Sequence, residues 1–259
     1  MKSALRKGLK AAMPVSRSLW KQSMTERYAP AWPCPTCRGG KLRLKPETLH
    51  YAETAASRQR HHEESWHITD YETAFSAMLE CGRCAQIVSC CGNGGLDQFE
   101  NRDEEGEFTV SESHFFRVKF FSLPMRILDI PRRYPSAVKE CLIRSFFVFF
   151  CDHRAAANHI RQCAEEVISH AGVPSANSKG NFVPLSKRIE EFSKIDAENA
   201  ERVDALRYIG NFGSHPEKIT MDNVCDAYDI LEVTLEDLYV GHQRSVRDLV
   251  KRIIHDRRP

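Results

Sequence analysis

The sequence has no long apolar run and no marked excess of charge of either sign. Its longest apolar stretch, residues 146–151, is far shorter than the roughly 20 residues that a membrane-spanning helix needs, so we expect no transmembrane segment. Its 37 basic and 35 acidic side chains give a net charge of +2. Binding to nucleic acid or to a membrane surface would therefore need a local patch of charge.

A secretion signal is also missing from the sequence. The first 13 residues are basic, but they lack the apolar core of about 7 to 15 residues that such a signal requires. We favour a basic first helix over a mitochondrial transit peptide, which the composition leaves open. Ten cysteines without a secretion signal indicate a reducing compartment, where thiols serve as metal ligands or buried groups more often than as disulfides. We therefore expect a cytoplasmic protein.

The composition changes near residue 125 and divides the sequence into two halves. The first half is rich in cysteine, glycine and histidine, whereas the second half shows helical periodicity. We expect a basic segment at 1–30, a cysteine-containing β module at 31–123 and an antiparallel helical bundle at 124–259. The predicted fold class is α+β, mainly α.

Helices are predicted wherever apolar residues recur at three-to-four spacing. The predicted helices cover about residues 135–151, 153–170, 185–192, 197–209 and a long stretch from residue 220. Ser136, Asp152 and Thr220 are the predicted N-cap residues of three of them. In the first half, residues 115–121 predict a strand, the run Cys91-Gly-Asn-Gly-Gly95 predicts a tight turn, and the acidic residues 100–107 predict a solvated loop.

Two CxxC units, Cys34-Pro-Thr-Cys37 and Cys81-Gly-Arg-Cys84, give the strongest chemical signal. Each can present two thiolates from a tight turn, and four sulfurs close a tetrahedron around zinc at about 2.3 Å. Four thiolates leave zinc no open position, so the predicted role is structural. A redox-active pair is the alternative, but no βαβ pattern surrounds either unit.

The spacing of the cysteines leaves two points open. The 43 residues between the pairs exceed the usual ribbon spacing of about 15 to 20, which indicates an insertion at the tip of a zinc ribbon. Cys90 and Cys91 lie near the second pair and are alternative ligands. We favour the interpretation that one of them is buried in a strand and that the other is incidental.

Arg207, Asn211 and His215 are spaced four apart, so they would share one face of an uninterrupted helix. A fixed cation, an amide and a group that titrates near neutrality suit a phosphodiester. The histidine could exchange a proton with a ribose hydroxyl or a leaving oxygen, and the guanidinium could stabilise phosphoryl charge without a metal. On local chemistry alone we favour the alternative, in which Gly210 ends the helix and His215 lies in a turn.

Several short motifs follow the cysteine pairs in order: Ile130-Pro-x-x-Tyr-Pro135, Arg161-x-x-x-Glu165, Leu185-x-x-Arg-Ile189 and Gly210-Asn-x-x-x-His215. In this order and spacing the chain resembles the domain of unknown function 4145 family, over roughly residues 33–240. That family is thought to be related to the HEPN superfamily of helical bundles. Many HEPN members are metal-independent ribonucleases that act as dimers in phage defence, toxin systems and RNA processing, whereas others are binding or scaffold domains. The resemblance implies a HEPN-like bundle after a zinc ribbon.

The resemblance also implies site residues. The superfamily's catalytic pair is an arginine followed after a few residues by a histidine, which points to Arg207 and His215 with Asn211 as the polar partner. Seven residues intervene here, more than is usual in the superfamily. Arg161 and Glu165 match the family's Arg-to-Glu helix and are secondary catalytic candidates, although an ion pair inside the bundle or between subunits suits them equally.

Three functions are compatible with these features. The first is a metal-independent endoribonuclease in prokaryotic anti-phage defence, with His215 as general acid/base, Arg207 as phosphate clamp and Asn211 as orienting group. It predicts a homodimer, because such sites are assembled across a twofold axis. The second is a non-catalytic module that binds nucleic acid or protein, and the third is a structural subunit of a defence or restriction assembly. The basic, amphipathic tail at 243–259 could contact RNA phosphates or a partner protein.

Overall fold

The chain forms two compact units in the computed structural model, which describes residues 15–37, 39–102, 108–212, 219–241, 249–250 and 252–255. The sheet unit is Ser16–Arg126, and the helical unit runs from Ile127 onward and includes Val15. An antiparallel sheet is thus followed by helices, which confirms the predicted order of β and α structure.

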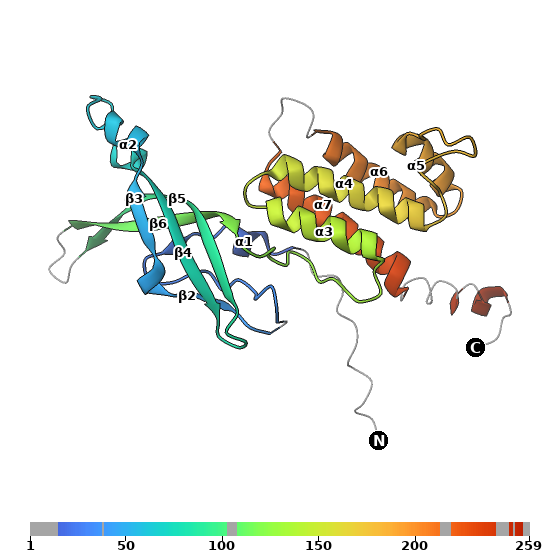
Figure 1. Ribbon diagram of the computed structural model, residues 1–259, viewed down its shortest axis with the longest axis horizontal. Coiled ribbons are helices and arrows are strands. Elements are labelled where there is room, and N and C mark those ends of the chain that lie inside the picture. The colour runs from blue at the N-terminus through green and yellow to red at the C-terminus, as the bar shows by residue number, and fades with distance from the viewer. Residues whose placement is uncertain are drawn as a thin grey trace, which may run out of the picture. The chain divides into compact units, whose positions relative to one another are not determined.

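The sheet unit is built on one antiparallel sheet of six strands (Figure 1). The strand order is β1-β6-β5-β4-β2, and β3 pairs with β4 beyond the end of β2. Strand β4 alternates buried and outward side chains along most of its length, so one face of the sheet carries the core. The strands are β1 Met24–Thr25, β2 Leu42–Leu44, β3 His50–Glu53, β4 Glu72–Cys81, β5 Ile87–Arg102 and β6 Phe108–Phe121. Short helical segments join them: α1 Arg17–Trp20, η1 Pro46–Thr48, α2 Ala55–Arg60 and η2 Ile68–Asp70.

The predicted turn at residues 91–95 is wrong, because β5 continues through this glycine-rich run. A Cβ atom on Gly92 would lie 2.1 Å from the carbonyl oxygen of Arg117 on β6, and one on Gly94 would lie 2.6 Å from that of Phe115. The pairing of β5 with β6 shifts register at Gly92, as in a β-bulge. These glycines therefore permit close approach of two strands rather than a reversal of the chain.

The acidic run was predicted to be a loop from residue 100 onward. Strand β5 instead runs to Arg102, so the first part of the run is extended and pairs with β6. Residues 103–107 lie outside the described part of the chain. The predicted strand at 115–121 is confirmed as the second half of the longer strand β6.

All five predicted helices are present in the helical unit (Figure 1). Helix α4 packs against α3, α6 and α7, and α5 packs on α6. The helices are α3 Ser136–Val148, α4 His153–His170, α5 Leu185–Ser193, α6 Ala197–Phe212 and α7 Met221–Leu235, and α7 continues into a π-helical turn, η3 Glu236–Val240. Among the helices of the described residues, none has both the length and the apolarity to cross a bilayer.

Two of the three predicted helix caps are confirmed. The Asp152 side chain accepts a hydrogen bond from the Ala155 amide at 2.9 Å, and the Thr220 hydroxyl accepts one from the Asn223 amide at 3.3 Å. The prediction for Ser136 is wrong, because Pro135 occupies the cap position and Ser136 is the first helical residue. The Pro135 carbonyl accepts the first hydrogen bond of the helix, from the Lys139 amide at 3.0 Å, and its side chain makes no cap hydrogen bond.

The core of the helical unit contains a buried polar contact among aromatic rings. The rings of Phe146 and Phe149 lie 5.5 and 5.8 Å from that of Tyr228, measured between centroids. The Tyr228 hydroxyl lies 2.6 Å from the Ser145 hydroxyl, which donates to the carbonyl of Ala156 at 2.9 Å. This hydrogen-bonded chain satisfies the buried hydroxyls of Ser145 on α3 and Tyr228 on α7.

Candidate metal centre and helical site

The two cysteine pairs meet at one end of the sheet. Cys34 and Cys37 lie in a loop that closes when the Cys34 amide donates to the carbonyl of Gly40 at 3.0 Å. This loop leads into β2, whose first residue, Leu42, is paired with Cys81 at the end of β4. The β2–β4 pairing therefore places the second cysteine pair directly beside the first.

The four sulfur atoms are spaced as the ligands of one ion. The Sγ atoms of Cys34, Cys37, Cys81 and Cys84 all lie within 4.8 Å of one another. The Cys34–Cys84 distance is 3.7 Å and the Cys37–Cys81 distance is 3.6 Å. A disulfide would need about 2.05 Å, whereas sulfurs at the corners of a tetrahedron with metal–sulfur bonds of about 2.3 Å lie about 3.8 Å apart. The four predicted ligands can therefore hold a metal ion.

Backbone amides in both turns point at the sulfurs. The Thr36 amide lies 3.4 Å from Cys34 Sγ, and the Arg83 amide lies 3.4 Å from Cys81 Sγ. Hydrogen bonds from the backbone amides of Cys84 and Arg83 lower the pKa of Cys81 to about 6. Such amides favour the thiolate, which is the form that binds a metal.

Gly40 is a site residue that the sequence analysis missed. A Cβ atom at this position would lie 2.2 Å from Cys81 Sγ and 2.9 Å from Cys37 Sγ. Only a residue without a side chain allows the backbone to pass this close to two sulfurs. The available signal was the glycine itself, three residues after the second cysteine.

The 43 residues between the pairs form an extension of the β-hairpin. Strand β2 pairs with the last three residues of β4, and β3 pairs with residues 73–76 of the same strand. Helix α2 and the turn η2 occupy the connection between β3 and β4. The long spacing is therefore taken up by strand pairing along β4 and by this connection at the far end of the hairpin.

Cys90 and Cys91 do not belong to the four-sulfur cluster. Cys90 is buried in β5, with its Sγ 4.0 Å from the sulfur of Met24, and Cys91 is exposed on the opposite face. Burial raises the pKa of the Cys90 thiol to about 12, which keeps it protonated. The prediction that one of the two cysteines is buried in a strand is confirmed.

The predicted catalytic residues lie at the end of α6. Helix α6 continues through Gly210 to Phe212, so the predicted break at Gly210 is wrong. Arg207 and Asn211 are therefore one turn apart on the same helix, and Asn211 is exposed. His215 lies outside the described residues.

Arg207 already has partners within its own helix. Its Nε atom is 2.7 Å from a carboxylate oxygen of Asp204, and its guanidinium lies 4.3 Å from the ring centroid of Tyr208. The hydrogen bond to Asp204 raises the pKa of Arg207 above its usual value. A substrate phosphate would have to compete with this carboxylate.

The secondary candidates Arg161 and Glu165 lie on α4. Arg161 Nη1 is 2.7 Å from Glu165 Oε1, in a half-buried i, i+4 ion pair. A Cβ atom on Gly210 would lie 2.6 Å from the Cβ atom of Arg161, so α4 and α6 touch at this point. The glycine therefore serves close helix packing, and it places Arg161 beside the turn of α6 that carries Arg207 and Asn211.

Helix α7 carries a titratable residue, Glu232, whose pKa is shifted. Burial, followed by repulsion from Glu236, Asp229 and Asp129, raises the pKa of Glu232 to about 7. The folded state therefore holds this proton more tightly than the unfolded chain does. The stability that protonated Glu232 contributes is complete below its unfolded pKa and is lost as the pH rises through about 7.

We expect the substitution Glu232→Gln to stabilise the helical unit at pH 8.5 by about 1 kcal/mol, a value that allows for solvent screening. The substitution should have little effect at pH 5, where Glu232 is protonated in the folded chain. Thermal unfolding at both pH values measures the difference. Glu140→Gln, an exposed change on α3, is the control and should give no pH-dependent gain.

Each unit matches a known family over most of its length. Residues 22–121 match a domain of unknown function (DUF8608), and residues 144–254 match a domain of unknown function (DUF4145). The second match contains the Arg161, Arg188 and Asn211 motifs, whereas both cysteine pairs fall in the first. Searches of curated proteins and of solved structures found no match.

Proposed function

Because residues 144–254 belong to the family of the domain of unknown function DUF4145, we propose that the helical unit is a HEPN-like, metal-independent endoribonuclease of prokaryotic anti-phage defence. The sheet unit carries a structural zinc ion, and the chain acts as a homodimer. The roles of the site residues follow from the family resemblance, and each is given to the residue of this chain that matches the motif.

Zinc is the ion that best suits the four cysteines. Soft thiolate ligands in a tetrahedral arrangement select zinc or iron–sulfur clusters over magnesium and calcium. The sulfur separations of 3.6 and 3.7 Å leave room for a single ion at the centre. With four protein ligands there is no open position for a substrate, so the ion would stabilise the sheet unit rather than take part in a reaction.

The unbroken course of α6 is the observation that supports a phosphodiester site. The sequence alone predicts that the helix ends at Gly210, which would separate Arg207 from Asn211. Helix α6 instead runs on to Phe212. Arg207 and Asn211 consequently share a face. Arg161 lies against Gly210, which stands between these two residues in the sequence. The aliphatic part of Arg161 thus lies where α4 meets the turn of α6 that carries Arg207 and Asn211.

In the proposed reaction each residue has one role. The ribose 2′-oxygen bonds to the adjacent phosphorus as the bond from phosphorus to the 5′-oxygen breaks, which leaves a 2′,3′-cyclic phosphate and a 5′-hydroxyl. His215 takes the proton from the 2′-hydroxyl or gives one to the leaving 5′-oxygen. Arg207 exchanges its Asp204 partner for a phosphoryl oxygen and stabilises the charge that develops there. Asn211 orients the phosphate by hydrogen bonding.

RNA cleavage by the full chain tests this proposal. We expect the wild-type chain to cut a mixed RNA in buffer without divalent ions, and Arg207→Ala and His215→Ala to lower the rate about 100-fold or more. Arg144→Ala and His159→Ala change the same residue types elsewhere in the helical unit and should keep wild-type activity. Bound metal is measured before and after the assay, so that loss of the sheet unit is not mistaken for loss of catalysis.

The proposed nuclease role would be rejected if the Arg207 and His215 variants cut RNA as fast as wild type. An inactive wild-type chain that also fails to bind RNA would favour the second candidate function, a scaffold that binds protein.

One feature of the sheet unit supports that second candidate. Beyond Gly95, β5 pairs only with the first half of β6, because the pairing of β4 ends at Glu72. This two-stranded arm exposes three large apolar side chains: Phe99, Phe108 and Val110. Isolated hairpins are marginally stable in water, so such an arm gains order when a partner covers it. The exposed carboxylates of Asp97, Glu100 and Glu112 would repel RNA phosphates, which makes a protein the better partner.

A further inference from the structure

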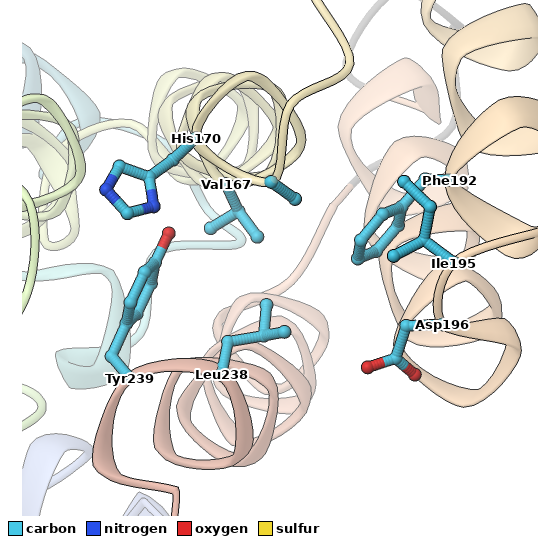
Figure 2. A pocket seen from close by; sticks show the side chains of 8 residues that line it. Val167, His170, Phe192, Ile195, Asp196, Leu238 and Tyr239 are labelled. Carbon is cyan, nitrogen blue, oxygen red and sulfur yellow. The ribbon is translucent and has the colours of Figure 1, made fainter.

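The helical unit contains a pocket that the proposed nuclease site does not use (Figure 2). It has a volume of about 230 Å³ and lies between the ends of α4 and α5 and the turn η3. Apolar side chains form most of its wall, with His170 and Tyr239 on one side and Asp196 on the other (Figure 2). The apolar lining residues are Val167, Ala171, Phe192, Ile195 and Leu238.

The π-helical turn shapes one wall of this pocket. Leu238 and Tyr239 both belong to η3, and π-helical turns are frequent at functional sites. The Tyr239 hydroxyl is buried and has no hydrogen-bond partner among the described residues. Its ring lies 5.3 Å from that of His170, measured between centroids. A segment that enters the pocket therefore meets a mostly apolar wall.

The tail of the chain has an apolar surface that is exposed among the described residues. Residues 249–250 and 252–255 are helical. Four side chains spaced to share one helix face are 43 %, 47 %, 40 % and 71 % exposed: Leu249, Val250, Ile253 and Ile254. The family match extends to residue 254, so it includes most of this segment.

The charges of the two surfaces are complementary. Residues 243–259 carry six basic and two acidic side chains. Asp196 lines the pocket, and Glu236 begins the turn that forms its wall. Opposite charges at the rim would favour approach and fix the orientation of the segment.

We propose that the pocket receives the helical tail segment, residues 249–255, of a second copy of this chain. The tail's apolar side chains are 40–71 % exposed, so the chain's own pocket does not cover them. Exchange between two copies fills both pockets by a twofold arrangement and doubles the buried area. Seven residues separate Leu249 from Gly241, whose φ of 72° ends η3, and a chain of this length can reach a second copy. This pairing does not depend on whether the helical unit cuts RNA.

The molar mass of the purified full chain tests the proposal, measured by light scattering over a range of concentrations. We expect the wild-type chain to be a dimer. Ile254→Asp in the tail and Ile195→Asp at the pocket should each shift the dissociation constant about 100-fold or more toward monomer, because a charge would be buried. Ile195 is 59 % exposed, so the substitution should leave folding intact. Phe182→Asp, at a side chain that is 75 % exposed elsewhere in the unit, is the matched control and should remain dimeric.

Mixing the two variants separates exchange from other modes of dimerisation. A pair of one Ile254→Asp chain and one Ile195→Asp chain keeps one intact tail in one intact pocket, so the mixture should dimerise more strongly than either variant alone. The proposal is overturned by a monomeric wild type, by dimers that persist in both variants, or by a mixture that associates no better than its components.

Discussion

Cys81→Ser should reduce bound metal from about one ion per chain to a small fraction of that and unfold the sheet unit. Cys81 is both a candidate ligand and the last residue of β4, so its loss removes a quarter of the sulfur cluster at the point where β2 and β4 join. A structural zinc ion contributes about 10–16 kcal/mol in small zinc domains at pH 7, as much as the total stability of a typical domain. Elemental analysis and circular dichroism on the same samples measure both effects.

The control for this prediction is Cys91→Ser. Cys91 is an exposed cysteine of the same sheet outside the cluster, so this variant should keep both its metal and its fold. A strong chelator should reproduce the Cys81→Ser effect on the wild-type chain, while the helical signal persists. Unchanged metal content after Cys81→Ser would show that the four cysteines are not the ligands.

Local patterns were the features that the sequence predicted well. A CxxC turn is set by its own four residues, so each pair was predictable from its spacing, whereas their meeting depends on the pairing of β2 with β4. The caps of α4 and α7 were likewise predictable, because Asp152 and Thr220 bond to amides only three residues away. The prediction for Ser136 failed by one position, because Pro135 is the cap residue and Ser136 is the first residue of the helix.

The glycines were misjudged because their role depends on distant residues. Gly92 and Gly94 look like turn residues, but β6 presses its backbone against both of them. Gly210 looks like a helix terminator, but it lies inside α6 against Arg161. A glycine marks either a reversal of the chain or a close approach, and only the tertiary partner decides between them.

The partners of charged side chains were equally hard to foresee. The sequence showed Arg207, but its contact with Asp204 depends on the rotamers of both residues and was not predicted. Arg188 appeared only as one letter of the Leu185-x-x-Arg-Ile189 motif. Its position in the structure gives that motif a physical meaning, because it is 2 % exposed and reaches from α5 to the end of α4.

Arg188 secures the C-terminal end of α4. Its Nη2 atom lies 3.0 Å from the carbonyl oxygen of Glu165, 2.7 Å from the hydroxyl of Ser169 and 3.0 Å from the carbonyl oxygen of Val173. The Val173 carbonyl lies just beyond the end of α4, where the helix dipole favours a cation, and the Glu165 carbonyl also accepts from the Ser169 hydroxyl at 3.0 Å. A buried guanidinium that bonds both to the helix and to the chain beyond it therefore holds α5 against α4.

Arg188→Met should lower the unfolding free energy of the helical unit by about 3 kcal/mol. Methionine fills similar space but donates no hydrogen bond, so buried acceptors at the end of α4 lose a charged donor. Thermal and denaturant unfolding measure the loss, which should lower the melting temperature by about 10 °C or more. Lys187→Met, at the exposed neighbouring position, should change stability by no more than about 0.5 kcal/mol. If Arg188→Met were as mild as Lys187→Met, Arg188 would not be what joins α5 to α4, and the motif would have to be explained by another role.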